Sequence, residues 1–265
     1  MRQQLISIIM PTYNADKFIK FTIDSVCSQN YKNWELIVVD DCSTDATCDV
    51  VKSVIKIDSR VKLISLEENC GAPARPRNIG VRNSLGDWVA FLDADDVWHP
   101  KKLMLQMQAI YKYKTDFCSS EMMNFSKNNE IEFLPCNSTK LELVTFKKQL
   151  IKHITPISSV LAKKDLFCKF PFNEEDRYRA REDVECCLRI HENIKSSVKL
   201  NCTLLFYRIS DDQISKSKWR MLLKNYMVLN EYRTISGKGL GWKKYYYWTT
   251  QVIFSFYYRL IKKTL

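Results

Sequence analysis

Short apolar runs alternate with helical stripes through residues 1–112, and this alternation leaves few folds open to the chain. Apolar residues at 19, 23, 26 and 27 share one face of a predicted helix, because three- and four-residue spacings bring side chains to the same side. The predicted strands around such stripes cover residues 5–10, 34–39, 61–65 and 88–92. A strand–helix–strand repeat predicts an α/β fold: a mainly parallel, Rossmann-like sheet with helices on both faces.

Acidic residues follow two of these strands. Asp40 and Asp41 come directly after the second strand, and Asp93, Asp95 and Asp96 come after the fourth. Because ligands of such sheets bind outside the carboxyl ends of the strands, these acids should converge on one rim. Close carboxylates repel each other unless a cation lies between them. The cluster is therefore predicted to bind a hard divalent metal ion and, through it, a diphosphate.

Three other places along the chain have side chains suited to a ligand. Tyr13 offers a flat face to a base, while Arg75 and Arg77 stand near the start of a predicted helix, which favours an anion. One carboxylate of the Glu182-Asp183 pair would take a proton from an attacking hydroxyl. Each place also has a purely structural interpretation: loop packing, surface charge, and acids in the first turn of a helix.

Taken in order along the chain, these motifs resemble the inverting glycosyltransferases of family 2, which have the GT-A fold. The matching segments are SIIMPTYN at 7–14, SQNY at 28–31, WELIVVDDCSTD at 34–45, ARPRNIG at 74–80, GDWVAFLDADDVW at 86–98, REDV at 181–184 and YR at 207–208. The resemblance implies a GT-A catalytic domain at 1–215, with a nucleotide-sugar half at 1–112 and an acceptor half at 113–215. A helical, basic C-terminal tail at 216–265 lies outside it.

The resemblance also implies a role for each matching position. The residues that would bind a nucleoside-diphosphate sugar, by expectation a UDP-sugar, are Pro11, Tyr13, Asp41, Arg75, Arg77, Asp93 and Asp95. Asp95 and Asp96 would hold Mn²⁺ or Mg²⁺, and Asp183 would deprotonate a hydroxyl of the acceptor, so that its attack inverts the anomeric carbon. The implied acceptor is a glycan or a lipid-linked sugar, as in relatives that build O-antigen, capsule or lipopolysaccharide.

The chain departs from the family pattern at three places. Cys42 stands where the family usually has Gly after the paired acids, and Pro76 is an extra residue within the Arg-Asn-x-Gly element. The Q-x-x-R-W signature of polymerising members is missing, since QISKSKW at 213–219 does not reproduce it. The third departure favours the addition of a single sugar.

Positive charge is concentrated in the last fifty residues. Residues 216–265 hold eleven Lys or Arg and one acid, so they carry +10 of the formal +11 of the chain. The stretch between Lys244 and Arg259 has 14 residues, well short of the roughly 20 that span a bilayer. Aromatic residues flanked by cations suit the surface of an anionic membrane, so we expect a cytoplasmic enzyme held peripherally on the inner face of the cell membrane.

The basic tail also fits two roles away from a membrane. It could be a C-terminal helix packed on the domain, or a contact in a homodimer. Nucleic acid is not expected as a partner, because the basic residues follow no known reading motif. The ten cysteines are scattered without a C-x-x-C pair, and residues 1–4 lack the form of a signal peptide. We therefore expect reduced core thiols, as in a cytosolic protein, and the alternative is a zinc site or a disulfide framework.

Two functions besides sugar transfer remain open. FLDADDV at 91–97 fits the D-x-D-x-[T/V] motif of haloacid-dehalogenase phosphatases, with Asp93 as the nucleophile. That motif usually follows the first strand of its fold, whereas three strand–helix units precede it here. A membrane-bound scaffold with an inactive nucleotide fold is the non-enzymatic alternative.

Overall fold

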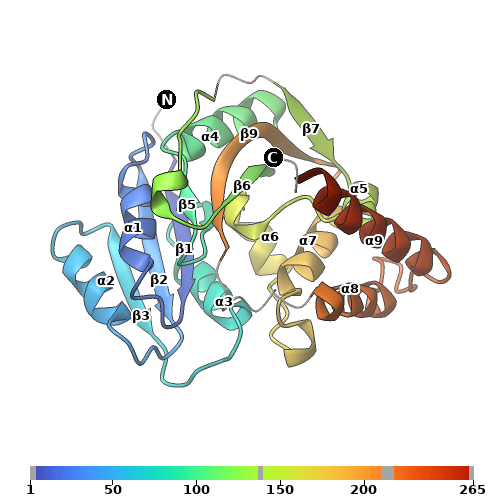
Figure 1. The fold of residues 1–265 in the computed structure, drawn as a ribbon, viewed down its shortest axis with the longest axis horizontal. Helices are drawn as coiled ribbons and strands as arrows, with labels where there is room; N and C mark the ends of the chain where they lie inside the picture. The colour runs from blue at the N-terminus through green and yellow to red at the C-terminus, as the bar shows by residue number, and fades with distance from the viewer. Residues whose placement is uncertain (1–3, 137–139, 210–217, 263–265) are drawn as a thin grey trace.

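A single mixed sheet organises the protein (Figure 1). The computed structural model describes residues 4–136, 140–209 and 218–262. The sheet order is β3-β2-β1-β4-β8-β6-β9-β5, with β7 paired to β9. The strands are β1 (Ile6–Thr12), β2 (Trp34–Asp40), β3 (Val61–Ser65), β4 (Trp88–Phe91), β5 (Val97–Trp98), β6 (Phe117–Phe125), β7 (Leu141–Val144), β8 (Leu161–Lys163) and β9 (Ser197–Arg208).

The predicted parallel pairing is confirmed for the first half of the chain, and the second half adds antiparallel pairs. Strands β1 to β4 pair in parallel, as the strand–helix alternation requires. In the second half β6 and β9 are parallel, but β8 is antiparallel to both β4 and β6, and β5 and β7 are antiparallel to β9. The sheet is therefore mixed beyond β4, where the strand–helix alternation gave no indication of the antiparallel pairs of β5, β7 and β8.

Helices cover both faces of the sheet, as predicted. They are α1 (Ile19–Cys27), α2 (Thr47–Ile55), α3 (Ala74–Asn83), α4 (Lys102–Tyr113), α5 (Phe146–Ile151), α6 (Lys164–Lys169), α7 (Glu182–Asn193), α8 (Lys218–Glu231) and α9 (Lys243–Lys262). Three short 3₁₀ turns are η1 (Asn128–Glu130), η2 (Ile157–Ser159) and η3 (Asp176–Tyr178).

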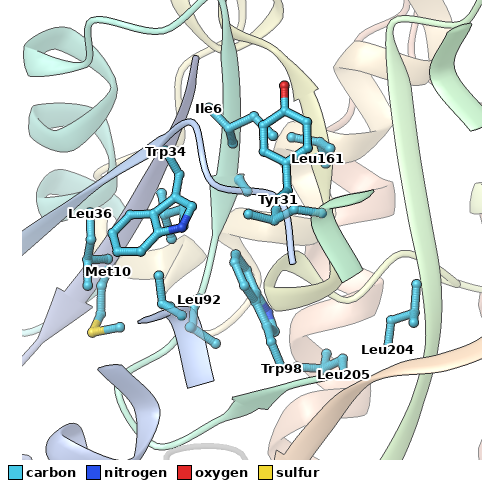
Figure 2. Close-up of a cluster of buried hydrophobic side chains, with 14 of the residues drawn as sticks. Ile6, Met10, Tyr31, Trp34, Leu36, Leu92, Trp98, Leu161, Leu204 and Leu205 are labelled. Carbon is cyan, nitrogen blue, oxygen red and sulfur yellow. The ribbon is translucent and has the colours of Figure 1, made fainter. Parts of the chain in front are cut away.

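Alternate side chains of the central strands enter two separate apolar cores. Ile8 and Met10 of β1 join the core under α1, α2 and α4, which also contains the tryptophans of Figure 2. Ile9 points to the other face and joins the core under α3, α6 and α7. Burial on both faces explains why β1 and β2 are mostly apolar in the sequence and do not alternate apolar with polar residues.

Gly80 allows α3 to lie close against β1. A Cβ atom built on Gly80 would overlap the side chain of Ile9. Only glycine fits here without a shift of helix or strand, which gives a packing reason for the glycine of the ARPRNIG segment. Because the strand cannot move, the start of α3 is fixed beside the carboxyl ends of β1 and β4.

Helices α8 and α9 pack on α5 and α7, at the opposite end of the molecule from α2 and β3 (Figure 1). The indole N–H of Trp248 donates to the carbonyl of Leu222 at 2.9 Å, and the Gln251 side chain donates to the carbonyl of Leu150 at 2.8 Å. Within the described residues, no helix combines the length and apolar character needed to cross a bilayer. Residues 213–217 of the QISKSKW segment lie outside the described part of the chain.

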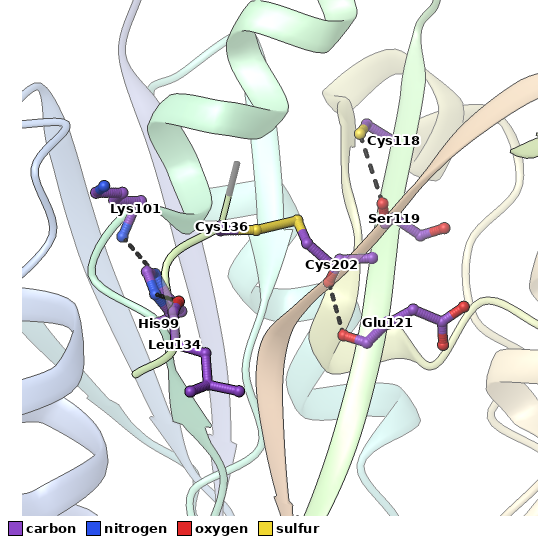
Figure 3. Close-up of a disulfide and its surroundings, with 9 residues drawn as sticks. His99, Lys101, Cys118, Ser119, Glu121, Leu134, Cys136 and Cys202 are labelled. Atoms are coloured by element: carbon purple, nitrogen blue, oxygen red, sulfur yellow. Dashed lines mark hydrogen bonds between the residues drawn. A yellow bond between two sulfur atoms is a disulfide. The ribbon is translucent and has the colours of Figure 1, made fainter. Parts of the chain in front are cut away.

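One pair of cysteines corrects the expectation of reduced thiols. Cys136 and Cys202 form a disulfide, with their Cα atoms 6.0 Å apart, which joins the segment before residue 137 to β9 (Figure 3). The other eight cysteines are free, and Cys118, Cys186 and Cys187 are buried core residues. The sequence could not predict the pair, because 66 residues separate its members and no spacing motif marks them.

Candidate functional site

A cavity of about 610 Å³ lies at the carboxyl ends of β1, β2 and β4. Its walls include 11–15, Asp41, 71–73, 76–77, 93–95, 156–158, 179–183, Tyr207 and Met221. The cavity therefore brings together loops from both halves of the chain. The predicted site residues in its walls are Pro11, Tyr13, Asp41, Arg77, Asp93, Asp95 and Asp183. Arg75 and Asp96 are not among the wall residues.

The acidic segment after β4 is held by backbone hydrogen bonds. The amide of Asp93 donates to the Ser158 hydroxyl at 3.2 Å. Arg208, at the end of β9, donates its amide to Oδ1 of Asp96 at 3.1 Å and its Nε to the carbonyl of Asp95 at 2.9 Å. Sequence reasoning gave no role to Ser158, and Arg208 was noted only as part of a motif.

Asp96 is completely buried beneath the cavity. Burial, followed by the charges of Asp95 and Asp93, raises the pKa of its carboxyl well above the usual range. The carboxyl thus serves the fold, by accepting the Arg208 amide that fixes this turn. Its predicted place among the metal ligands stays a prediction.

Asp95 fits a metal site better. Burial and the neighbouring charge of Asp93 raise the pKa of Asp95 to about 6. A cation bound between the two carboxylates would offset their mutual repulsion. Across the described ranges, no three His, Cys, Asp or Glu side chains form a ready-made metal cluster. Mg²⁺ commonly takes only one or two protein carboxylates and completes its shell with substrate phosphates and water, so these residues suit such an ion.

Arg77 connects the acidic segment to α7. Its guanidinium is 3% exposed and donates to Oδ1 of Asp93 at 2.7 Å and to Oε1 of Glu182 at 2.9 Å. Burial alone would lower the pKa of Arg77, but these carboxylates outweigh it, and the pKa is raised. Because Arg77 forms a salt bridge on each side, it holds Asp93 and Glu182 in position. Its contact with the donor stays a prediction.

The loop after β2 shapes the opposite wall. Oδ1 of Asp41 accepts the amide of Cys70 at 2.8 Å, and the Asn69 side chain donates to the carbonyl of Asp41 at 2.8 Å. Cys42 has φ of +64°, a left-handed conformation that glycine adopts most easily, which accounts for the glycine that the family has there. Tyr13 is half exposed in the wall and free to present its ring.

Two cationic wall residues, Arg179 and Arg181, were given no role from the sequence. Arg181, directly before α7, is largely buried, and burial lowers its pKa in spite of Asp183 and Glu182 nearby. Its Nε has no hydrogen-bond partner among the described residues. Arg179 also lines the cavity. The signals in the sequence were the REDV segment, which begins at Arg181, and the run of arginines at 177, 179 and 181.

Asp183 lies in the first turn of α7, where its Oδ1 accepts the amide of Val184 at 2.8 Å. It is partly exposed and faces the same cavity as Asp93 and Asp95. Since 88 residues separate Asp95 from Asp183, only the folded sheet could place the two carboxyls on one cavity. The arrangement can hold a diphosphate ester near one carboxyl and accept a proton at the other.

The sequence of this chain is similar to those of known proteins over most of its length. The sequence profile described as "Glycosyl transferase family 2" matches residues 7–166. The chain is 31% identical over 234 residues to the "Putative teichuronic acid biosynthesis glycosyltransferase TuaG" of Bacillus subtilis (strain 168), covering 86% of this chain and 88% of that one. It is 32% identical over 234 residues to the "UDP-Glc:alpha-D-GlcNAc-diphosphoundecaprenol beta-1,3-glucosyltransferase WfgD" of Escherichia coli, with 88% of each chain covered.

Solved structures show the same fold. Staphylococcus aureus TarS 1-349 in complex with UDP-GlcNAc superposes with a TM-score of 0.70 at 22% identity, covering 86% of this chain and 66% of that one. The mannosyltransferase PcManGT from Pyrobaculum calidifontis, in complex with GDP-Man and Mn²⁺, gives 0.65 at 17% identity, with 86% and 64% covered. This chain thus spans just under two thirds of either crystallised chain.

Proposed function

The chain belongs to glycosyltransferase family 2 and has the GT-A fold, and from this premise we propose that it moves one sugar from a nucleoside-diphosphate sugar to an acceptor hydroxyl with inversion. The observation that carries the proposal is the shared cavity, which has Asp93 and Asp95 in one wall and Asp183 in another. Family membership makes the protein a glycosyltransferase and decides against the phosphatase alternative.

On the donor side, the nucleoside lies against Pro11, Tyr13 and Asp41, where the ring of Tyr13 is exposed for stacking. The diphosphate lies towards Asp93 and Asp95. A bound Mn²⁺ or Mg²⁺ would be held by Asp95 and would neutralise charge on the departing nucleoside diphosphate. Arg77 holds Asp93 in place, so that the acidic segment keeps its shape when the donor is absent.

On the acceptor side, Asp183 takes the proton of the acceptor hydroxyl. The hydroxyl oxygen then forms a bond to the anomeric carbon, while the bond from that carbon to the diphosphate oxygen breaks on the opposite face. The electron pair leaves with the nucleoside diphosphate, so configuration is inverted. Arg181, two residues before Asp183, places a guanidinium in the same wall of the cavity.

The named relatives suggest the biological class of product. TuaG is named for teichuronic acid biosynthesis, and WfgD for transfer from UDP-Glc to a diphosphoundecaprenol-linked sugar. We therefore assign this chain to the synthesis of a bacterial surface polysaccharide, with a UDP-sugar as donor and a glycan or lipid-linked acceptor. Departure from the polymerising signature supports addition of one sugar.

The surface of α8 and α9 supports peripheral attachment to an anionic membrane from the cytoplasmic side. Trp242, Lys243, Tyr245 and Tyr246 are exposed at the start of α9. Aromatic side chains with adjacent lysines partition into the interface between lipid headgroups and acyl chains. A homodimer contact through the same surface is the competing use, and the oligomeric state in solution distinguishes the two.

Two substitutions test the roles of the carboxyls. Asp183→Asn should keep the affinity for a UDP-sugar with Mn²⁺ within about twofold but lower kcat by roughly 10²- to 10⁴-fold, as loss of a general base does. Asp95→Asn should lose the Mn²⁺ dependence of donor binding. Thermal shift with a panel of nucleoside-diphosphate sugars measures binding, and release of nucleoside diphosphate in the presence of acceptor measures transfer.

Asp49→Asn on α2 is the matched control, since this carboxylate is exposed and remote from the cavity. It should behave like the parent in both assays. Normal turnover in Asp183→Asn, or an unchanged Mn²⁺ response in Asp95→Asn, contradicts the proposal. Tight donor binding by the parent without transfer to any lipid-linked acceptor supports the scaffold alternative.

A further inference from the structure

Four cations gather where α7 and α8 meet the cavity. Arg179 and Arg181 line its wall before α7, while Arg220 and Lys224 belong to the first two turns of α8. We call these four residues the α7–α8 cation cluster. The ammonium of Lys224 donates to the backbone carbonyl of Arg179, so α8 is joined to the segment that precedes α7.

The cluster is placed at the mouth of the cavity. A Cβ atom built on Gly71 would lie 3.6 Å from Nη1 of Arg179, so this guanidinium reaches across to the loop on the facing wall. Deeper inside, Arg181 has a buried Nε without a hydrogen-bond partner among the described residues. An anion entering here would meet both side chains.

Positive charge exceeds negative charge at this place. Of the two carboxylates beside the cluster, Glu182 already forms an ion pair with Arg77 at 2.9 Å, and Asp183 lies near Arg181. Burial and the positive charges of Arg179, Arg181 and Arg220 lower the pKa of Lys224, although Glu182 opposes them. Such crowding of like charges is relieved when an anion binds between them.

Apolar side chains stand next to the cations on α8. Arg220 and Lys224 are four residues apart and share one face of the helix, and Trp219 and Leu223 form the adjacent stripe. Trp219 is 75% exposed and Leu223 is 65% exposed, while Met221 reaches the cavity wall. Two cations of the cluster, Arg179 and Arg181, thus line the cavity, and an exposed apolar stripe adjoins the other two.

We propose that the α7–α8 cation cluster binds a phosphate group of a lipid-linked acceptor, with the lipid chain lying along Trp219 and Leu223. This inference rests on the proposed transfer function and names the class of its acceptor: a glycosyl phosphate or diphosphate ester of a long-chain alcohol. Because Arg181 precedes Asp183 by only two residues, a phosphate held there brings the first sugar of the acceptor to the proton acceptor. The metal-bound diphosphate of the donor belongs instead to the wall formed by Asp93 and Asp95.

The test uses octyl phosphate, below its critical micelle concentration, and neutral octyl glucoside as probes on the full chain. The variant Arg220→Ala/Lys224→Ala removes two cations that are not wall residues and leaves Arg179 and Arg181 in place. We expect its Kd for octyl phosphate to rise at least tenfold. Its Kd for UDP with Mn²⁺ should stay within twofold of the parent, as should its weak binding of octyl glucoside.

Two further variants serve as controls. Lys52→Ala/Lys56→Ala removes two exposed lysines at α2 and should bind octyl phosphate like the parent. Arg220→Lys/Lys224→Arg keeps both charges and should restore most of the affinity. An equal loss in the α2 variant would overturn the inference, because the effect would then be one of net charge.

Different results identify a different source of phosphate. If Arg220→Ala/Lys224→Ala loses UDP affinity, the cluster serves the donor and the inference is wrong. It is also wrong if the variant loses only its binding to phosphatidylglycerol vesicles and keeps its affinity for octyl phosphate. If inorganic phosphate competes as well as octyl phosphate does, the apolar part of the site is refuted. If the parent binds octyl phosphate through the cluster but binds no nucleoside diphosphate, the transfer function is refuted. The phosphate site is still supported in that case.

Discussion

Arg77 is a buried cation shared by two carboxylates, and nothing in its motif indicates the second of them. The strand order was enough to place Asp41, Asp93 and Asp95 at one rim, since the carboxyl ends of parallel strands meet there. Glu182, by contrast, lies 105 residues after Arg77 and reaches it only through the docking of α7. The residue-level predictions succeeded where backbone topology decides position and were incomplete where side-chain packing decides it.

Removal of the Arg77 guanidinium should destabilise the fold. Arg77→Leu leaves Asp93 and Glu182 facing each other without their cation, and loss of one partner of a buried ion pair costs ~3–5 kcal/mol. Urea unfolding measures the change. Arg82→Leu, an exposed position of the same helix, should change the free energy of unfolding by less than about 0.5 kcal/mol. Equal stability of the two variants would show that Arg77 is dispensable for the fold.

Lys102 is a second buried cation, on α4, and no carboxylate of the described ranges forms a salt bridge with it. Its ammonium donates to Oε1 of Gln106 at 2.8 Å and lies 3.9 Å from the centre of the Trp98 ring. Burial lowers its pKa to about 7, against 10.5 for the ordinary side chain. Between these two pH values the unfolded chain binds the proton and the folded chain does not, so stability rises with pH across this window.

Lys102→Met should remove that rise, because the replacement does not titrate. The difference in unfolding free energy between parent and Lys102→Met, measured by urea unfolding from about pH 6.5 to 9, should shift in favour of the parent as pH increases. Lys112→Met, at an exposed position of the same helix, should leave the pH profile unchanged. A constant difference across the range would mean that Lys102 titrates alike in both states.

At the scale of helices and strands, the sequence of the first half predicted its elements well, because β1, β2 and β4 are buried on both faces and each helix is buried on one. The residues of β1 and β2 and of α1 and α2 show this pattern without interruption. Strands β5 and β8, of two and three residues, carry no periodicity of their own. Their antiparallel pairing comes from neighbouring strands, and a sequence pattern cannot predict it.

The contact between α3 and β1 gives an element-scale prediction. Gly80→Ala places a methyl group against Ile9 and should destabilise the protein by about 1–3 kcal/mol, the usual cost of overpacking a rigid core. Thermal unfolding measures the effect, and Arg82→Ala on the exposed side of α3 is the control. Gly80→Ala/Ile9→Val, which removes a methyl group from the other side, should recover part of the loss. Unchanged stability of Gly80→Ala would show that α3 can move away from the sheet.

At the scale of the whole molecule, charge is unevenly distributed along the chain, and the sequence predicted this. The last fifty residues carry most of the net charge, and the structure arranges part of it beside exposed aromatic rings at the start of α9. What composition could not provide is the packing of the other side of α9 on α5 and α8, which depends on contacts such as Gln251 with Leu150. The predicted division of the chain at residue 215 stays a prediction.

Membrane binding should depend on the exposed start of α9. Lys243→Ala should weaken binding to phosphatidylglycerol vesicles about fivefold, since one basic residue near an anionic surface contributes ~1 kcal/mol. Trp242→Ala should weaken it through loss of an interfacial ring. Cosedimentation with vesicles measures both, with Lys52→Ala as the control for net charge. If roughly 0.5 M salt leaves parent binding unchanged, the electrostatic contribution is absent.

The short connection between β4 and β5 joins two different places in one sheet, because β4 pairs with β1 and β8 whereas β5 pairs with β9. This connection is therefore held at both ends by strand pairing, and in its middle by Ser158 and Arg208. The carboxylates of this connection are therefore in position before a ligand binds. Because the connection is already ordered, ligand binding removes little of its conformational entropy. Little of the binding free energy is then spent on ordering the protein.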